Sequence, residues 1–219
     1  DTIARQSDEQ SGAHSIRELE RIRDDNLIAI MQALKANDWG AGRVLADYER
    51  MLFERGAVRQ AEPDLSRPIL TVERAVPPDW TDYNNHMNEA RYGQLFSDAT
   101  DALMRLIGAD SDYVARGLSY FTVEGHIRFL DEVAAMEPVR VETQVLAGAG
   151  RKLHLFHELR HGDGRLLATG EYMLLHVSLE SRRSCEPEAA VAEKLGEIAT
   201  LHAALPAPEG AGRAIGAGR

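Results

Sequence analysis

The sequence predicts an α+β fold in which one curved antiparallel sheet wraps around a single long helix. Residues 69–76 form two alternating sets of side chains, with the two-residue period of a strand. A wide apolar face with helical spacing follows over residues 88–108, and four further strand-like runs come after it. A lone long helix must bury its apolar face, and a curved sheet around it is the simplest way to do so.

The four later strands are apolar, alternating runs with short connections between them. They are predicted at residues 119–129, 139–146, 152–160 and 165–178. Segments 147–150 and 161–164 have the glycine-rich composition of hairpin loops, so the last three strands form an antiparallel meander. The helix has Asn88 as its candidate N-cap and Gly108 as the residue that follows its C-terminus.

The regions on either side have other patterns. Residues 1–56 read as a helical hairpin that opens with the capping box Ser15-Ile16-Arg17-Glu18, and residues 57–67 as a linker. The sheet and its helix occupy residues 68–179. Residues 180–219 are predicted to hold a C-terminal helix and a mobile Gly/Ala/Pro-rich tail.

Composition narrows the possible functions. Of the 219 residues, 44% are hydrophobic, which is enough for a core, and the net charge of −10 argues against a nucleic-acid partner. No apolar run approaches the roughly 20 residues that cross a bilayer, and the first residues do not resemble a signal peptide, so no membrane partner is expected. With one cysteine, Cys185, no internal disulfide is possible, and a cytoplasmic location is the expectation.

The most informative segment is Trp80-Thr81-Asp82-Tyr83-Asn84-Asn85-His86-Met87-Asn88, which lies between the first strand and the long helix. It places the Asp82 carboxylate beside a helix N-terminus, whose free N–H groups can stabilise a developing oxyanion. This combination suits acyl transfer, with Asp82 as a general base or nucleophile. In the alternative interpretation, Asp82 only caps a turn before the helix.

The element order and Asp82-Tyr83-Asn84-Asn85-His86-Met87-Asn88 resemble the hotdog-fold thioesterases of the 4-hydroxybenzoyl-CoA thioesterase type. That family has Asp-x-x-Gly-His-x-Asn at the start of its central helix, and here Asn85 replaces the glycine. Asparagine tolerates a left-handed backbone better than most residues, so the loop can be preserved, although its side chain could intrude on the thioester site.

Longer segments are similar to a narrower subgroup, the betainyl-CoA thioesterases of carnitine degradation. They are residues 80–92, 96–101 and 120–128. In this subgroup the thioesterase can follow an L-carnitine dehydrogenase, and residues 19–27 are similar to the last helices of such dehydrogenases. The resemblance implies that residues 1–56 are the end of a dehydrogenase whose catalytic part lies upstream.

The resemblance implies that Asp82 either attacks the thioester carbonyl or activates water. The sequence does not decide between these two roles. The backbone N–H groups of Met87, Asn88 and Glu89 would face the thioester oxygen. His86 and Asn88 could position the thioester, or they could be structural, with His86 bonded to the backbone and Asn88 capping the helix.

A betainyl group is cationic and donates no hydrogen bond, so its pocket should use aromatic faces and a carboxylate. The candidates are Trp80, Tyr83, Tyr92, Tyr120, Phe121 and Glu124. By simple alternation, Glu124 shares a face of its strand with Tyr120, Thr122, His126 and Arg128. Each ring could instead fill the core, and Glu124 could instead form a cross-strand pair.

Coenzyme A carries phosphates, for which the candidate partners are Arg128, Arg151 and Lys152, although basic residues on a loop are often only solvated. His154 and His157 point to opposite faces of a strand, so no metal is expected, and no cofactor either.

The sequence therefore predicts hydrolysis of a small acyl-CoA, betainyl-CoA in particular, to the free acid and CoA. The exposed edges and face of a lone sheet predict a homodimer or a dimer of dimers, with sites at the subunit boundary. Two alternatives stay open. One is a non-catalytic module that dimerises a dehydrogenase, and the other is a hotdog acyl-CoA hydratase or dehydratase.

Overall fold

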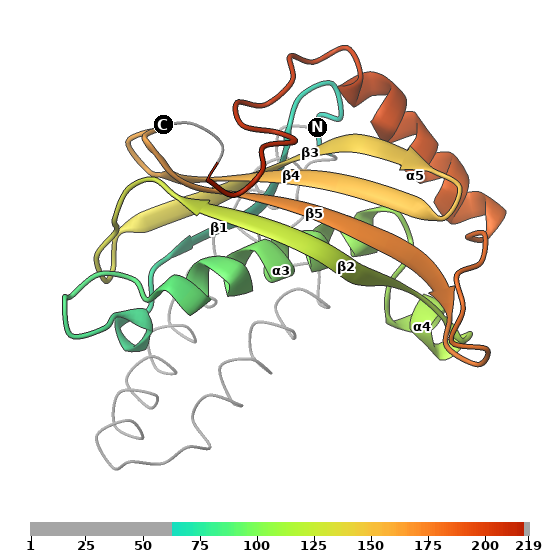
Figure 1. The fold of residues 1–219 in the computed structure, drawn as a ribbon, viewed down its shortest axis with the longest axis horizontal. Coiled ribbons are helices and arrows are strands. Elements are labelled where there is room, and N and C mark those ends of the chain that lie inside the picture. The colour runs from blue at the N-terminus through green and yellow to red at the C-terminus, as the bar shows by residue number, and fades with distance from the viewer. Residues whose placement is uncertain (1–62, 217–219) are drawn as a thin grey trace, which may run out of the picture. The chain divides into compact units, whose positions relative to one another are not determined.

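The structure is a computed structural model, and it describes residues 63–216. The predicted helical hairpin at residues 1–56 and most of the predicted linker lie outside these residues. The described part contains five strands and three α-helices (Figure 1). The strands are β1 (Ile69–Ala75), β2 (Leu118–Phe129), β3 (Pro138–Ala149), β4 (Lys152–His161) and β5 (Leu166–Ser178). The helices are α3 (Glu89–Leu106), α4 (Ser111–Ala115) and α5 (Ala189–His202), and a 3-10 turn, η1, spans Pro78–Trp80.

The strands form one antiparallel sheet in the order β1-β3-β4-β5-β2. The predicted meander of the last three strands is confirmed. Since β1 and β2 lie at opposite edges, α3, which connects them, must cross the sheet from one edge to the other. We call the face against α3 the inner face and the opposite one the outer face (Figure 1).

The long helix α3 is held by its caps and by its apolar stripe. The Asn88 side chain accepts a hydrogen bond from the Ala90 N–H, and Gly108 takes a left-handed backbone with φ of 82° just beyond the last turn. Both predicted boundaries are confirmed. The side chains that face the sheet are fully buried: Leu95, Phe96, Ala99 and Leu103.

The helix α5 covers the part of β3 that extends beyond β1. Its last residue, His202, accepts the Val145 N–H at Nδ1 (N···N 2.9 Å) and donates from Nε2 to the Arg67 carbonyl oxygen (3.1 Å). The imidazole therefore satisfies a backbone N–H of β3 beyond the residues that pair with β1. Burial lowers the pKa of His202.

The C-terminal segment lies across the outer face of the sheet (Figure 1). Its Gly212 N–H donates to both carboxylate oxygens of Glu171 on β5 (2.8 and 3.0 Å), and the Gln144 side chain on β3 donates to the Pro206 carbonyl oxygen (3.3 Å). The sequence predicts a mobile tail, whereas these contacts attach residues 206–212 to the sheet. Within the described residues, no helix has both the length and the apolar character needed to cross a membrane.

We expect the free energy of unfolding to fall as the pH drops from about 6.5 towards 3, because of His157. This imidazole is fully buried between Thr100 and Thr143, and burial lowers its pKa to about 3. Below pH 6.5 the unfolded chain protonates His157 and the folded chain does not, so its contribution is present above pH 6.5 and decreases by about 1.4 kcal/mol per pH unit below it.

Urea unfolding at several pH values measures this slope. The variant His157→Gln, which does not titrate, should show a smaller loss between pH 6.5 and 3 than the wild type. Equal slopes in the two proteins would contradict the assignment.

Candidate functional site

The segment from Trp80 to Asn88 folds into a tight loop in front of α3. The Asp82 N–H donates to the His86 carbonyl oxygen (3.0 Å), and the Asn85 N–H donates to the Asp82 carbonyl oxygen (3.0 Å). Asn85 has a left-handed backbone, with φ of 63°. The asparagine thus takes a backbone conformation that glycine adopts freely, at the position where the sequence departs from the motif.

The Asp82 side chain is half-buried at this loop. One carboxylate oxygen, Oδ1, accepts the Asn84 N–H (2.8 Å), which is the contact expected if Asp82 caps a turn. The other oxygen, Oδ2, has no hydrogen-bond partner among the described residues. The carboxylate is therefore oriented by one oxygen, and the second oxygen can still accept a proton or attack a carbonyl.

The loop is braced by residues 131–137, which connect β2 to β3. The Met87 N–H donates to the Val133 carbonyl oxygen (2.8 Å), and His86 forms a β-bridge with Ala134. Arg165 on the next hairpin holds this brace, since its Nη1 donates to Asp131 Oδ2 (2.6 Å) and lies 3.1 Å from the Glu132 carbonyl oxygen. The Arg165 guanidinium also holds the pKa of the Asp131 carboxyl below its ordinary value.

Two of the three predicted oxyanion donors are already used. The Met87 N–H bonds to Val133, and the Asn88 N–H donates to the Trp80 carbonyl oxygen (2.9 Å). Only the Glu89 N–H, at the first position of α3, has no partner within the described part of the chain. The prediction for Met87 and Asn88 is wrong, because β-bridges that close the loop consume their donors.

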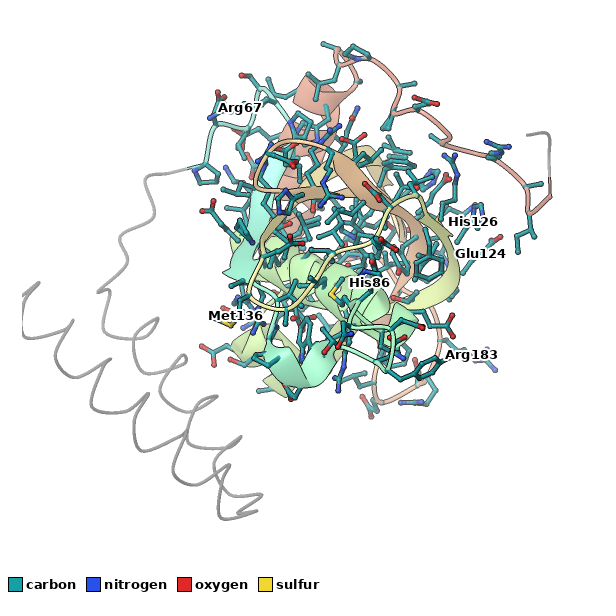
Figure 2. All side chains as sticks on the ribbon, turned by 90° about the vertical axis from the view of Figure 1, so that its left-hand side faces the viewer. Arg67, His86, Glu124, His126, Met136 and Arg183 are labelled. Atoms are coloured by element: carbon teal, nitrogen blue, oxygen red, sulfur yellow. The ribbon has the colours of Figure 1, made fainter. Side chains whose placement is uncertain are left out.

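The other two polar residues of the motif have local roles. Asn88 caps α3 through its side chain, as in the structural interpretation. His86 Nδ1 lies 3.2 Å from Glu132 Oε2, and the imidazole is 40% exposed. In Figure 2, His86 lies near the middle of the view and Glu124 lies to its right, so the two do not form one cluster.

The predicted carboxylate of β2 lies on the wrong face. Tyr120 and Thr122 pair with His176 and Leu174 of β5, but the register shifts after Thr122, and Glu124 pairs with Met173. Directly paired residues point to the same face of a sheet, so this bulge turns Glu124 to the outer face. There it lines a hollow of ≈ 370 Å³ together with His126, Glu171 and the C-terminal Gly212.

The predicted aromatic residues do not form one cage within a single chain. Trp80 is buried, and the guanidinium groups of Arg74 and Arg91 lie 4.7 and 5.4 Å from its ring. Tyr92 is buried against Phe129, with ring centroids 5.2 Å apart. Tyr83 is 92% exposed, and Phe121, on β2, is 39% exposed.

The predicted CoA-binding residues also lie apart. Along β5, Arg128 pairs with Thr169 and the Lys152 of β4 pairs with Leu175, six positions away, which is about 20 Å. Arg151 adjoins Lys152, and its Nε donates to Glu186 (3.0 Å). Only Arg128 lies at the end of the sheet where the brace at residues 131–137 holds the Asp82 loop.

A cleft of ≈ 270 Å³ lies between α3 and the strands β2 and β5, on the inner face. Its lining residues are Gly93, Phe96, Ser97, Thr100, Asp101, Met104, Tyr120, Thr122, Tyr172 and Leu174. Of the predicted acyl-binding residues, it contains only Tyr120. Asp101 and Tyr172 were missed from the sequence.

Two glycines inside strands, Gly125 and Gly170, are a feature of the sequence that could have indicated this cleft. A Cβ at Gly125 would lie 2.9 Å from the Tyr172 ring, and one at Gly170 would lie 2.7 Å from the Phe96 ring and 2.8 Å from the Tyr172 ring. Glycine weakens a strand interior, so its presence there often marks a place where another group approaches closely, and here the two rings do.

The two histidines of β4 point to opposite faces, as predicted. His154 Nε2 lies 2.7 Å from Glu171 on the outer face, whereas His157 is buried against α3. Among residues 63–216, no three His, Cys, Asp or Glu side chains are grouped so that they could hold a metal ion.

Comparison with known proteins places this geometry in a class. Residues 76–195, more than half of the chain, match the thioesterase-like superfamily. The chain belongs to this superfamily, and the curved sheet around α3 is its hotdog fold.

Two curated relatives and one solved structure are informative. A Ruegeria pomeroyi protein named L-carnitine dehydrogenase/betainyl-CoA thioesterase is 55% identical over 215 residues, which cover 98% of this chain but 44% of that protein. A Pseudomonas aeruginosa protein named betainyl-CoA thioesterase is 47% identical over 154 residues, which cover 69% of this chain and 97% of that protein. A Staphylococcus aureus protein, solved in complex with CoA, aligns with a TM-score of 0.64 at 25% identity, covering 68% of this chain and 96% of that one. The chain thus spans less than half the length of the fused relative.

We expect Asn85→Ala to lower the free energy of unfolding by about 1 kcal/mol and Asn85→Gly to leave it nearly unchanged. The reason is the left-handed backbone of Asn85, which alanine adopts at a cost and glycine adopts freely. Urea unfolding measures both values, with Asn84→Ala at the neighbouring position as the control. A larger loss with glycine than with alanine would contradict the assignment.

Proposed function

We propose that this chain hydrolyses a small acyl-CoA thioester, betainyl-CoA, to betaine and free CoA. The observation that carries the proposal is the 47% identity with the P. aeruginosa betainyl-CoA thioesterase over 97% of that protein's length. The Asp82 loop, with Asn85 in a left-handed backbone and one carboxylate oxygen held by the Asn84 N–H, gives it a chemical basis.

Asp82 is the reacting carboxylate in this proposal, and two routes are compatible with its position. As a nucleophile, it attacks the thioester carbonyl, CoA leaves as the thiolate, and water hydrolyses the resulting anhydride. As a general base, it takes a proton from water, which attacks the carbonyl directly. In both routes the Glu89 N–H at the start of α3 stabilises the oxyanion.

After turnover in water labelled with ¹⁸O, label found in Asp82 identifies the nucleophilic route. In a single turnover, the nucleophilic route leaves the label in Asp82 when water attacks the aspartyl carbonyl of the anhydride. The general-base route places it in betaine.

We expect Asp82→Asn to lower kcat by about 100- to 10,000-fold, because the amide can neither attack nor accept the proton. The measurement is release of free thiol from betainyl-CoA. The matched control is Asp79→Asn in the neighbouring turn η1, which should keep wild-type activity. Unchanged thermal unfolding would show that the variant still folds, and retention of most activity in Asp82→Asn would sink the proposal.

A non-catalytic module that dimerises a dehydrogenase is the second candidate. Its support was Asn85 in place of glycine, and the fused relative covers a further region beyond this chain. The left-handed backbone of Asn85 weakens that support, since glycine adopts the same conformation freely. Thiol release from a panel of acyl-CoAs separates the two candidates.

We also propose a homodimer formed along β2, which the sheet order leaves at an edge. This strand of 12 residues carries exposed apolar side chains, including Phe121 and Val123. A long edge with such side chains favours pairing with a second strand. The position of Asp82 outside the α3 cleft also favours a site that two chains complete.

We expect sedimentation to give at least the mass of two chains, and Val123→Asp to shift the equilibrium towards single chains by placing a charge in the interface. The matched control is Leu201→Asp on α5, which is 39% exposed and lies away from β2. A wild-type chain that is active as a stable monomer would contradict the proposed dimer.

A further inference from the structure

We propose that the α3 cleft is the determinant of selectivity for a quaternary ammonium acyl group, which the rings of Tyr120 and Tyr172 and the Asp101 carboxylate would enclose. The inference rests on the proposed thioesterase function and assigns residues to its substrate preference. It replaces the predicted role of Glu124, which the bulge in β2 places on the outer face.

The lining of the cleft has the composition that such a cation requires. Three aromatic residues, Phe96, Tyr120 and Tyr172, are among its ten lining residues. Asp101 is its only charged residue, because no lysine, arginine, histidine or glutamate lines it. A trimethylammonium group donates no hydrogen bonds and is bound through aromatic faces and by opposite charge, so this surface fits it.

The aromatic wall is built into the sheet. Tyr172 fits between two strand glycines, since a Cβ at Gly125 or at Gly170 would come within 3 Å of its ring. Burial raises the pKa of Tyr172 to about 12, so the ring stays a neutral phenol. The Tyr120 ring packs edge-on against His176 at 4.9 Å, which fixes its orientation.

The charged end of the cleft is available to a ligand. Asp101 is exposed, and within residues 63–216 no ion pair or hydrogen bond to its side chain is found. The Tyr120 hydroxyl oxygen is buried and has no hydrogen-bond partner among the same residues. The ring of Tyr120, rather than its buried hydroxyl, is therefore the part that would contact the cation.

The length of α3 sets a requirement for the reaction. Asp101 lies twelve residues beyond Glu89, which is about 18 Å along the helix axis. In betainyl-CoA only one carbon separates the ammonium nitrogen from the thioester carbonyl. A cation bound at Asp101 thus cannot react with the Asp82 that precedes the same helix, and the Asp82 loop of a second chain must supply the carboxylate.

The test compares two substrates of the same shape. Betainyl-CoA carries a quaternary nitrogen where 3,3-dimethylbutanoyl-CoA carries a carbon atom, so the second is a neutral copy of the first. The measured quantity is the ratio of kcat/KM for betainyl-CoA to kcat/KM for the neutral thioester. We expect Asp101→Asn and Tyr120→Leu each to lower this ratio at least about tenfold.

Two variants serve as controls. Tyr120→Phe keeps the ring and should restore the ratio to near the wild-type value. Asp112→Asn removes the same charge from α4, outside the cleft, and should leave the ratio unchanged. If Asp101→Asn lowers kcat/KM for both substrates in parallel, the cation-binding role is overturned.

Failure of the proposed function has a different signature, since the wild type would then release thiol from neither substrate. In that case, calorimetric titration of the wild type and of Asp101→Asn with tetramethylammonium tests the cleft directly. Binding that Asp101→Asn weakens at least about tenfold supports the inference. Absence of binding, or equal binding by the two proteins, overturns it.

Discussion

The fold depends on the burial of one face of α3. Because β1 and β2 lie at opposite edges of the sheet, the helix between them has to cross all the strands, and its stripe of Leu95, Phe96, Ala99 and Leu103 is fully buried in doing so. Burial of this kind contributes about 25 cal/mol per Å² of apolar surface. Once α3 is placed, its N-terminus lies next to the loop that connects β2 to β3, and this position sets the location of the Asp82 loop.

The loop in front of α3 is held in place by hydrogen bonds that its own backbone N–H groups donate. The N–H groups of Met87 and Asn88 close β-bridges with the chain on either side, so they are lost to the oxyanion. Of the three predicted donors, only the Glu89 N–H is left for chemistry, beside an Asp82 oxygen that has no partner among residues 63–216. Arg165 contributes from a distance, since it holds Asp131 and Glu132 and thereby the brace behind the loop.

Short-range sequence patterns predicted the helices and strands, whereas the pairing between distant strands determines which side chains reach the site. The N-cap at Asn88, the glycine after α3 and the hairpin glycines are short-range patterns, and all were readable. The short helix α4 was missed, although Asp110 caps it by accepting two N–H groups. The bulge after Thr122 has no local pattern, because strict alternation fits β2 equally well. That one extra residue moves Glu124, His126 and Arg128 to the outer face, which no count of spacing could reveal.

The position of Asp101 is unfavourable for the helix that carries it. Aspartate has low helix propensity, and in the second half of α3 its charge opposes the helix dipole. Asp101 is the thirteenth of the 18 residues of α3, so it gains nothing from the N-terminus either. With no ion pair to it among the described residues, local stability does not account for it. The proposed recognition of a cation accounts for it, because that ligand requires a carboxylate that has no partner among residues 63–216 and shares a cleft with aromatic rings.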